Sequence, residues 1–175
     1  MDTKIIITNS QGEEFSVAIG FDLLASMVGS MPDQKNMAEL CDFLSVHESA
    51  EVRDAIASKE FLSETTLVRL SEDTNPTVKA SLVRSESFRE WVDSETLIEM
   101  CRSNSALARE IASSVGSFTN ADTDALVKEL AAHSDPAVRM EIASGWGLSK
   151  FSIRSLSKDS DPSVASTAQR TLENR

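Results

Sequence analysis

The sequence predicts an all-α protein, an α-solenoid of about five short helix-pair repeats that follows a small N-terminal β-hairpin. The first observation is a phrase written three times, as NPTV at 75–78, DPAV at 135–138 and DPSV at 161–164. The second is the residue four positions beyond each phrase's valine, which is apolar and marks one face of a helix. Units repeated every 26 to 31 residues are typical of helical arrays in which each repeat stacks on its neighbours.

The first twenty residues follow a different pattern. KIIIT and EEFSVAI are rich in β-branched residues, and NSQG lies between them. Phe15, Val17 and Ile19 alternate onto one face, which is typical of a strand. We therefore expect a β-hairpin over residues 1–20 and a helical repeat domain over residues 21–175. Because an isolated hairpin is marginal in water, we expect it to cap the first helices or to pair along its edge with a partner or a second copy.

Five predicted helix starts share one apolar column, with a capping residue three positions earlier. Ser, Asn or Asp stands at the cap, where a side-chain oxygen can accept a hydrogen bond from an N–H of the first turn. Proline follows the cap in three of the five starts, and its missing N–H costs nothing at that position. The column residues are Val52, Val78, Leu107, Val138 and Val164, and the caps are Ser49, Asn75, Asn104, Asp135 and Asp161.

A second short helix completes each pair. Neither helix can bury its apolar stripe alone, so neighbouring pairs must share a continuous core. Residues 22–47 are interpreted as an atypical first pair, and the last unit has only one helix, from Pro162 to about Leu172. The apolar positions of the second helices are Cys41 and Leu44, Leu67 and Leu70, Leu97 and Met100, Val127 and Leu130, and Ile153 and Leu156, with predicted caps at Ser63, Ser94, Asp122 and Ser149.

Two stretches, AEVRDAIASKEFLSETTLVRLSEDTNPTVKASL and PAVRMEIASGWGLSKFSIRSLSKDSDPSV, resemble the HEAT-like and leucine-rich-repeat-variant (LRV) families of α-helical repeats. The family pattern runs D-P-x-V-R-x-x-x-A, a spacer, and L-x-x-L-x-x-D, and the resemblance covers about residues 36–172. It implies a curved right-handed α-solenoid that serves as a protein-binding surface. The chain departs from the pattern in its longer middle units and at Ala108 and Ala165, which stand where other units have a basic residue.

Composition limits the function classes. The 175 residues carry 28 acidic and 17 basic side chains, for a net charge of −11, so a surface that holds nucleic acid through Lys and Arg is not expected. No stretch reaches the roughly 20 apolar residues needed to cross a bilayer, and the first residues lack the basic start of a signal peptide. We therefore expect no membrane contact and a cytoplasmic protein. The acidic charge favours a basic partner.

The sequence contains no pattern typical of catalysis. There is no nucleophile elbow, P-loop, zincin or EF-hand pattern. Cys41 and Cys101 stand alone, which is not the spacing of a zinc or cluster site. His47 and His133 each lie two residues before a cap, near the end of a second helix, where the helix dipole favours an imidazole. We therefore predict that the protein is not an enzyme and holds no cofactor and no metal.

The candidate binding residues lie in aromatic turns and on the outward faces of the second helices. Phe61, Trp91, Phe118 and Trp146 each fall in the predicted turn between first and second helices, where they either pack between units or form a ladder for a partner. Tryptophan is enriched at binding hot spots, and Trp146, bracketed by two glycines, is the leading anchor. The outward positions of the last second helix are Phe151, Ser155 and Lys158. The partner-binding set is Trp146, Trp91, Arg69, Glu72, Glu99, Arg102 and Glu129.

These observations favour a non-catalytic scaffold or adaptor that holds a partner protein or peptide on a small acidic solenoid. The alternative is an acidic inhibitor, of the immunity or antitoxin kind, that blocks a basic site on a target protein. A remote alternative is a HEAT-like-repeat DNA glycosylase, with Trp91, Asp93 or Trp146 at its site, although clustered Lys and Arg are lacking. The oligomeric state stays open.

Overall fold

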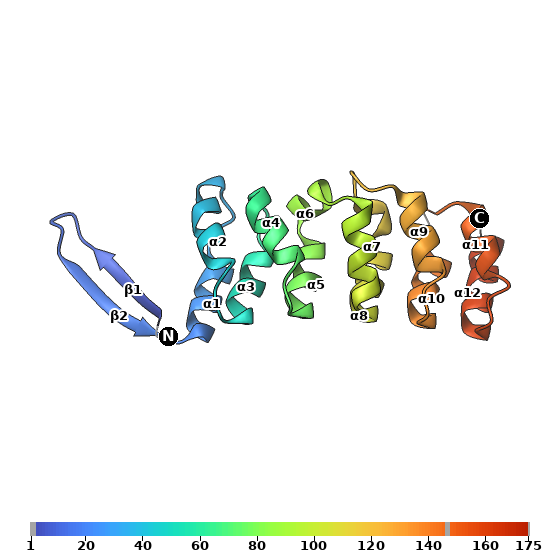
Figure 1. Cartoon of the computed structure of the whole chain (residues 1–175), viewed down its shortest axis with the longest axis horizontal. Helices are drawn as coiled ribbons and strands as arrows, with labels where there is room; N and C mark the ends of the chain where they lie inside the picture. Colours follow the sequence, from blue (N-terminus) through green and yellow to red (C-terminus); the bar gives the residue numbers. More distant parts are fainter. Residues whose placement is uncertain (1–2, 146–147, 175) are drawn as a thin grey trace. The chain divides into compact units, whose positions relative to one another are not determined.

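The structure, a computed structural model, describes residues 3–145 and 148–174. Within those residues the chain forms twelve α-helices, two 3-10 helices and one two-stranded antiparallel sheet (Figure 1). The prediction of a helical protein with a small N-terminal hairpin is therefore confirmed. Backbone contacts divide the chain into two compact units, residues 1–85 and 86–175. No helix in the described part is both long enough and apolar enough to span a bilayer.

The hairpin consists of β1 (Thr3–Thr8) and β2 (Glu14–Ile19), paired antiparallel. Asn9 holds the turn, because its side-chain oxygen accepts two backbone N–H bonds at 3.0 Å from within the loop. Gly12 has φ of +83°, a conformation that favours glycine because it has no Cβ. The turn predicted at NSQG is therefore confirmed.

The register places the predicted apolar face on one side of the hairpin. Ile5 lies opposite Val17, and Ile7 lies opposite Phe15, so these four side chains share a face. Phe15 is 65% exposed and Ile7 is 59% exposed. Much of the apolar face is therefore open to solvent.

The helices of the first unit lie in two rows. The helix α3 packs against both α1 and α5, and α2 packs against α4 (Figure 1). Between the rows lie fully buried side chains that include Val52, Ile56 and Leu70. The bounds are α1 (Phe21–Ser30), η1 (Lys35–Met37), α2 (Ala38–Leu44), α3 (Ala50–Ala57), α4 (Glu64–Ser71) and α5 (Pro76–Arg84).

A buried lysine ties the first unit together. Lys59 follows α3, and its Nζ donates to the carbonyl oxygens of Gly29 at 3.2 Å and Met31 at 2.7 Å. Such carbonyls at a helix end have no partner within the helix. The carbonyl of Lys59 accepts a bond from Ser85 Oγ. Lys59 therefore links the end of α1 to α3 and to the residue that follows α5.

The second unit has the same two-row arrangement. The helix α10 packs against α8 and α12, while α9 packs against α7 and α11 (Figure 1). Its bounds are α6 (Glu86–Trp91), α7 (Ser94–Ser103), α8 (Ser105–Ser113), η2 (Val115–Ser117), α9 (Thr123–Ala131), α10 (Pro136–Ser144), α11 (Lys150–Leu156) and α12 (Pro162–Glu173).

Four of the five predicted caps of the first helices are confirmed. The side chains of Asn75, Asn104, Asp135 and Asp161 each accept a backbone N–H bond from the first turn. Ser49 precedes α3 as predicted, but its side chain makes no cap bond. The five column residues are all buried: Val52, Val78, Leu107, Val138 and Val164.

The two histidines have equivalent local roles. His47 Nδ1 accepts the backbone N–H of Ser49 at 3.1 Å, and His133 Nδ1 accepts that of Asp135 at 3.0 Å. Each imidazole therefore fixes the chain where it enters the next helix.

Three of the four predicted caps of the second helices are confirmed. Ser63, Asp122 and Ser149 accept bonds from the first turns of α4, α9 and α11. The prediction for Ser94 was wrong, because Asp93 caps α7 and Ser94 lies inside the helix. Ser94 Oγ instead accepts the backbone N–H of Asp122 at 2.6 Å.

The short helix α6 occupies a position where the sequence predicted a turn. Phe88 at its centre is fully buried. Trp91 is therefore the last residue of a helix, and its ring packs 5.9 Å from that of Phe88. The helix α6 accounts for part of the extra length of the repeat between Val78 and Leu107.

Two bidentate Arg–Asp pairs join successive helix starts. In the second unit, Arg139 Nε and Nη2 donate to the Asp159 carboxylate at 2.8 and 2.9 Å, and Nη1 donates to the carbonyls of His133 and Ser134. Asp159 also accepts the backbone N–H of Asp161 at 2.8 Å. These bonds lower the pKa of Asp159, the largest contribution coming from Arg139.

The first unit contains the same arrangement. Arg53 donates to Asp73 at 2.6 and 3.1 Å and to the carbonyls of His47 and Glu48. Asp73 accepts the backbone N–H of Asn75 at 2.8 Å. The Arg and Asp of the V-R and L-x-x-L-x-x-D parts of the repeat pattern are therefore partners in both units.

Candidate functional site

The predicted polar residues of the first unit lie on and beside α4. Arg69 Nη1 donates to the Asp42 carbonyl at 3.2 Å and lies 3.4 Å from Ser45 Oγ, so it bridges to α2. Glu72 follows the last residue of α4 and is exposed. Arg69 therefore has a partner within its own unit, while Glu72 faces solvent.

The predicted polar residues of the second unit include one ion pair. Arg102 of α7 and Glu129 of α9 pair through Nε–Oε1 at 2.7 Å and Nη2–Oε2 at 3.0 Å. The hydrogen bond from Arg102 is the main cause of the lowered pKa of Glu129. Glu99 on α7 is exposed. The structure thus brings Arg102 and Glu129 together and leaves Glu99 on the surface.

The predicted aromatic residues differ in exposure. Phe61 is partly exposed in the turn after α3, whereas Phe118 is buried after η2. Trp91 is half-buried against Phe88 at the end of α6. Trp146, the leading anchor predicted from the sequence, lies outside the described residues.

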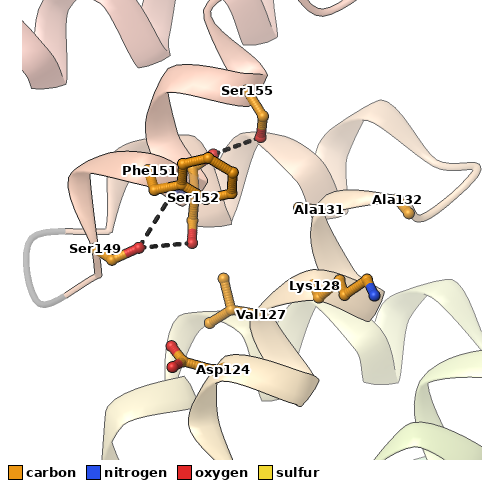
Figure 2. A pocket seen from close by; sticks show the side chains of 9 residues that line it. All are labelled: Asp124, Val127, Lys128, Ala131, Ala132, Ser149, Phe151, Ser152 and Ser155. Atoms are coloured by element: carbon orange, nitrogen blue, oxygen red, sulfur yellow. Dashed lines mark hydrogen bonds between the residues drawn. The ribbon is translucent and has the colours of Figure 1, made fainter.

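A groove lies between α9 and α11 in the second unit (Figure 2). Its volume is about 440 Å³. Phe151 is 84% exposed, the highest value among the exposed large apolar side chains of the described chain. Ser149 caps α11, and Ile153 and Leu156 point into the core, so Phe151 is left on the outer side of the helix. The lining residues are Asp124, Val127, Lys128, Ala131, Ala132, Ser149, Phe151, Ser152 and Ser155.

Small side chains open this groove. Ala131 at the end of α9, Ala132 just after it, and Ser152 and Ser155 on α11 all line the groove, and none of these side chains is long enough to fill the space (Figure 2). The serine hydroxyls already bond within α11: Ser155 Oγ donates to the Ser152 carbonyl, and Ser149 Oγ lies 2.9 Å from Ser152 Oγ. The groove therefore presents an aromatic ring and alkyl groups beside hydroxyls whose bonds are local.

The lining of this groove carries one charge of each sign, and further cations lie on the α11 side. Lys128 lines it together with Asp124. Lys150 and Arg154 lie on α11, Lys158 follows its end, and no carboxylate occurs in the sequence from residue 142 to residue 158. All four cations are exposed, and within the described residues none forms an ion pair.

A second cavity of the second unit is polar, and its charged groups are already paired. It is lined by residues that include His133, Arg139, Asp159 and Asp161. Arg139 and Asp159 bond to each other, and Asp161 caps α12. These groups hold the helix starts, so the groove between α9 and α11 is the stronger candidate.

The described residues contain no cluster of three or more His, Cys, Asp or Glu side chains that could hold a metal ion. Cys41 and Cys101 are free and buried. Burial raises the pKa of Cys101 to about 12, so its thiol stays protonated at neutral pH.

These features define a mainly helical protein with an exposed groove on its second unit. Comparison of the chain with known protein families, curated proteins and solved structures found no match.

Sequence reasoning placed Phe151 on the outward face but did not select it as a binding residue. The signal was present: a phenylalanine at an outward position of a helix whose inward positions were already apolar. The small residues Ala131 and Ala132 at the end of the neighbouring helix were a second signal. Only the structure shows that the two surfaces face each other.

Proposed function

We propose that the protein is a non-catalytic scaffold, an α-solenoid of HEAT-like or LRV-type repeats, and that it holds a peptide segment of a partner protein in the groove between α9 and α11. The observation that carries this proposal is the exposure of Phe151 at the edge of a groove of about 440 Å³. Burying an aromatic ring removes apolar surface from water, which is the main source of affinity at such contacts.

The size and chemistry of the groove support a peptide as the occupant. Its volume is within the range of about 300–1,000 Å³ that is typical of ligand sites. Ala131 offers an alkyl contact, Val127 lies at the floor of the groove with 3% of its surface exposed, and Phe151 offers a ring that a partner side chain can cover. The lining residues supply no free nucleophile or paired acid and base, which favours binding over chemistry.

The solenoid part of the proposal is supported by the repeated packing within each unit. Alternate helices pack against one another in both units. Each unit also contains the same bidentate Arg–Asp pair, which joins two successive helix starts. Repetition of one structural module, here a helix pair with the same contacts, is the expected basis of a stacked array.

The test is recovery of partners from the native host on the immobilised full chain, using Phe151→Ser and the control Phe43→Ser. Phe43 is also highly exposed, at 75%, but lies on α2 in the other unit. Because both rings are exposed, neither change should disturb folding, which circular dichroism will check. We expect the same proteins on wild type and Phe43→Ser and their loss on Phe151→Ser. Recovery that does not depend on Phe151 would refute the proposed site.

A further inference from the structure

We propose that the segment held in this groove is acidic, with apolar side chains on Phe151 and Val127 and with Asp or Glu side chains facing Lys128, Arg154 and Lys158. This inference rests on the proposed function and specifies its partner. The net charge of the whole chain favours a basic partner, whereas the groove would prefer an acidic one.

The arrangement of side chains on α11 is the first support. Phe151, Arg154 and Lys158 are spaced i, i+3 and i+7, which places them along one side of a helical path. Lys158 lies just beyond the last helical residue. An occupant that covers the ring of Phe151 would therefore pass beside two cations on the α11 side. Lys128 is a third cation, on the α9 side of the same groove (Figure 2).

The lack of ion pairs is the second support. Elsewhere in the described chain, Arg53, Arg102 and Arg139 each form a bidentate pair with a carboxylate, although acidic residues outnumber basic ones. The cations around the groove have no such partner among the described residues. The chain therefore leaves them unpaired despite an excess of carboxylates.

Helix stability does not account for this cluster. Arg154 is in the last turn of α11, where a cation interacts favourably with the helix dipole. Lys150, however, is the first residue of the helix, where positive charge is unfavourable. Asp124 is the one carboxylate that lines the groove and it balances Lys128, so the positive excess comes from the cations on and just after α11. Charge complementarity therefore favours an acidic segment. Asp124 would repel an Asp or Glu side chain of that segment at the end of the groove where Asp124 lies.

The experiment selects random 12-residue peptides displayed on phage against the immobilised full chain, with counter-selection on Phe151→Ser. Enriched peptides are synthesised with a fluorophore, each beside a version in which Asp and Glu are replaced by Asn and Gln. Binding is measured by anisotropy at low and high salt. We expect enrichment of peptides that combine aromatic or aliphatic anchors with Asp and Glu, and weaker binding at high salt because exposed charges are screened.

Charge variants then localise the effect. Replacing both Arg154 and Lys158 by Gln should weaken the acidic peptides about 3- to 10-fold, since each exposed pair contributes modestly. The matched control is Arg170→Gln, an exposed cation on α12 in the other helix row of the same unit. That change should alter binding less than about 2-fold.

The outcomes separate the two proposals. Peptides that require Phe151 but are neutral or basic would overturn the acidic preference and leave the scaffold standing. Absence of any peptide that depends on Phe151 would overturn the scaffold as well. Displacement of the acidic peptides by a 12-nucleotide single strand at equal concentration would also overturn the inference, because the cations would then serve a nucleic acid.

Discussion

The pair of Arg139 and Asp159 should contribute more to stability than any exposed ion pair of the chain. The perturbation is Arg139→Met, which keeps an unbranched apolar stem and removes every donor. Four hydrogen bonds are lost, two to Asp159 and two to the carbonyls of His133 and Ser134. The Arg139 and Asp159 side chains are only 12% and 9% exposed, so water replaces these bonds incompletely.

The expected loss is about 2–3 kcal/mol in the free energy of unfolding, near the lower end for breaking a buried pair because some solvent reaches it. For a chain of this size, each kcal/mol corresponds to about 2–4 °C in Tm. Both tryptophans belong to residues 86–175, so tryptophan fluorescence during urea unfolding reports on the unit that holds this pair.

The same pair makes stability depend on acid pH. The pKa of Asp159 in the folded chain is lowered, first by Arg139, below its unfolded value of about 4. Its contribution is therefore fully present above about pH 4 and is lost as the pH falls through the folded pKa. Wild type should exceed Asp159→Asn in stability at pH 7, and the difference should shrink progressively below pH 4.

The matched control is Arg102→Met. Arg102 forms a bidentate pair of similar geometry with Glu129, but its side chain is 65% exposed. Loss of this pair should have a much smaller effect, because solvent screens it. Arg53→Met removes the equivalent Arg–Asp pair of the first unit. It should lower the free energy of unfolding by a similar amount when unfolding is followed by circular dichroism. Equal losses for Arg139→Met and Arg102→Met would refute the reasoning that burial sets the contribution.

Four further predictions concern separate features. Asn104→Ala should lower the free energy of unfolding by about 1 kcal/mol in urea, because Asn104 accepts two N–H bonds at the start of α8. Lys59→Met should lower it by about 1–3 kcal/mol in thermal melts, because the carbonyls of Gly29 and Met31 lose the donor that the buried lysine supplies. The Cys101 thiol, with its pKa raised to about 12, should not react with a chromogenic disulfide at pH 8 until the chain unfolds. Phe15→Ser should change thermal stability by less than about 1 kcal/mol, because the ring is largely exposed.

Each of these has a control or a contradicting result. Asn104→Asp should retain most of the cap, so equal losses for Ala and Asp would exclude capping as the cause. A Lys59→Met variant as stable as wild type would mean that the carbonyls find other partners. Fast labelling of native Cys101 would show that its site opens readily. A large loss from Phe15→Ser would show that the hairpin face is covered.

The helix starts could be predicted because their signals are local. A cap residue, a proline and an apolar residue three positions after the cap act within one turn, as at Asp135 and Asp161. The same locality explains the error at Ser94. Asp93 and Ser94 are both good caps, and the choice between them depends on a distant partner, the N–H of Asp122. The sequence of α7 alone does not indicate that bond.

Predictions that depended on tertiary packing were less complete. The helix α6 forms around Phe88, whose burial requires neighbours that the repeat pattern does not name. The groove depends on the facing surfaces of α9 and α11, so neither helix predicts it alone. The frequency of tryptophan at binding hot spots favoured Trp91 as a binding residue, although its ring packs on Phe88. The same criterion did not select Phe151.

The division of basic residues into paired and unpaired groups connects the architecture with the proposed binding. Arg53 and Arg139 follow a buried valine at a helix start, and each bonds to an Asp 20 residues later, just before the next helix of the same row. Their position in the pattern makes them structural. Arg154 on α11 and Lys158 just beyond it lie outside that position, in a stretch that has no carboxylate from residue 142 to residue 158, and they have no ion-pair partner among the described residues. Because the chain uses its Arg–Asp bonds where helices must be held together, the cations that it leaves unpaired beside an exposed ring are the ones expected to meet a partner.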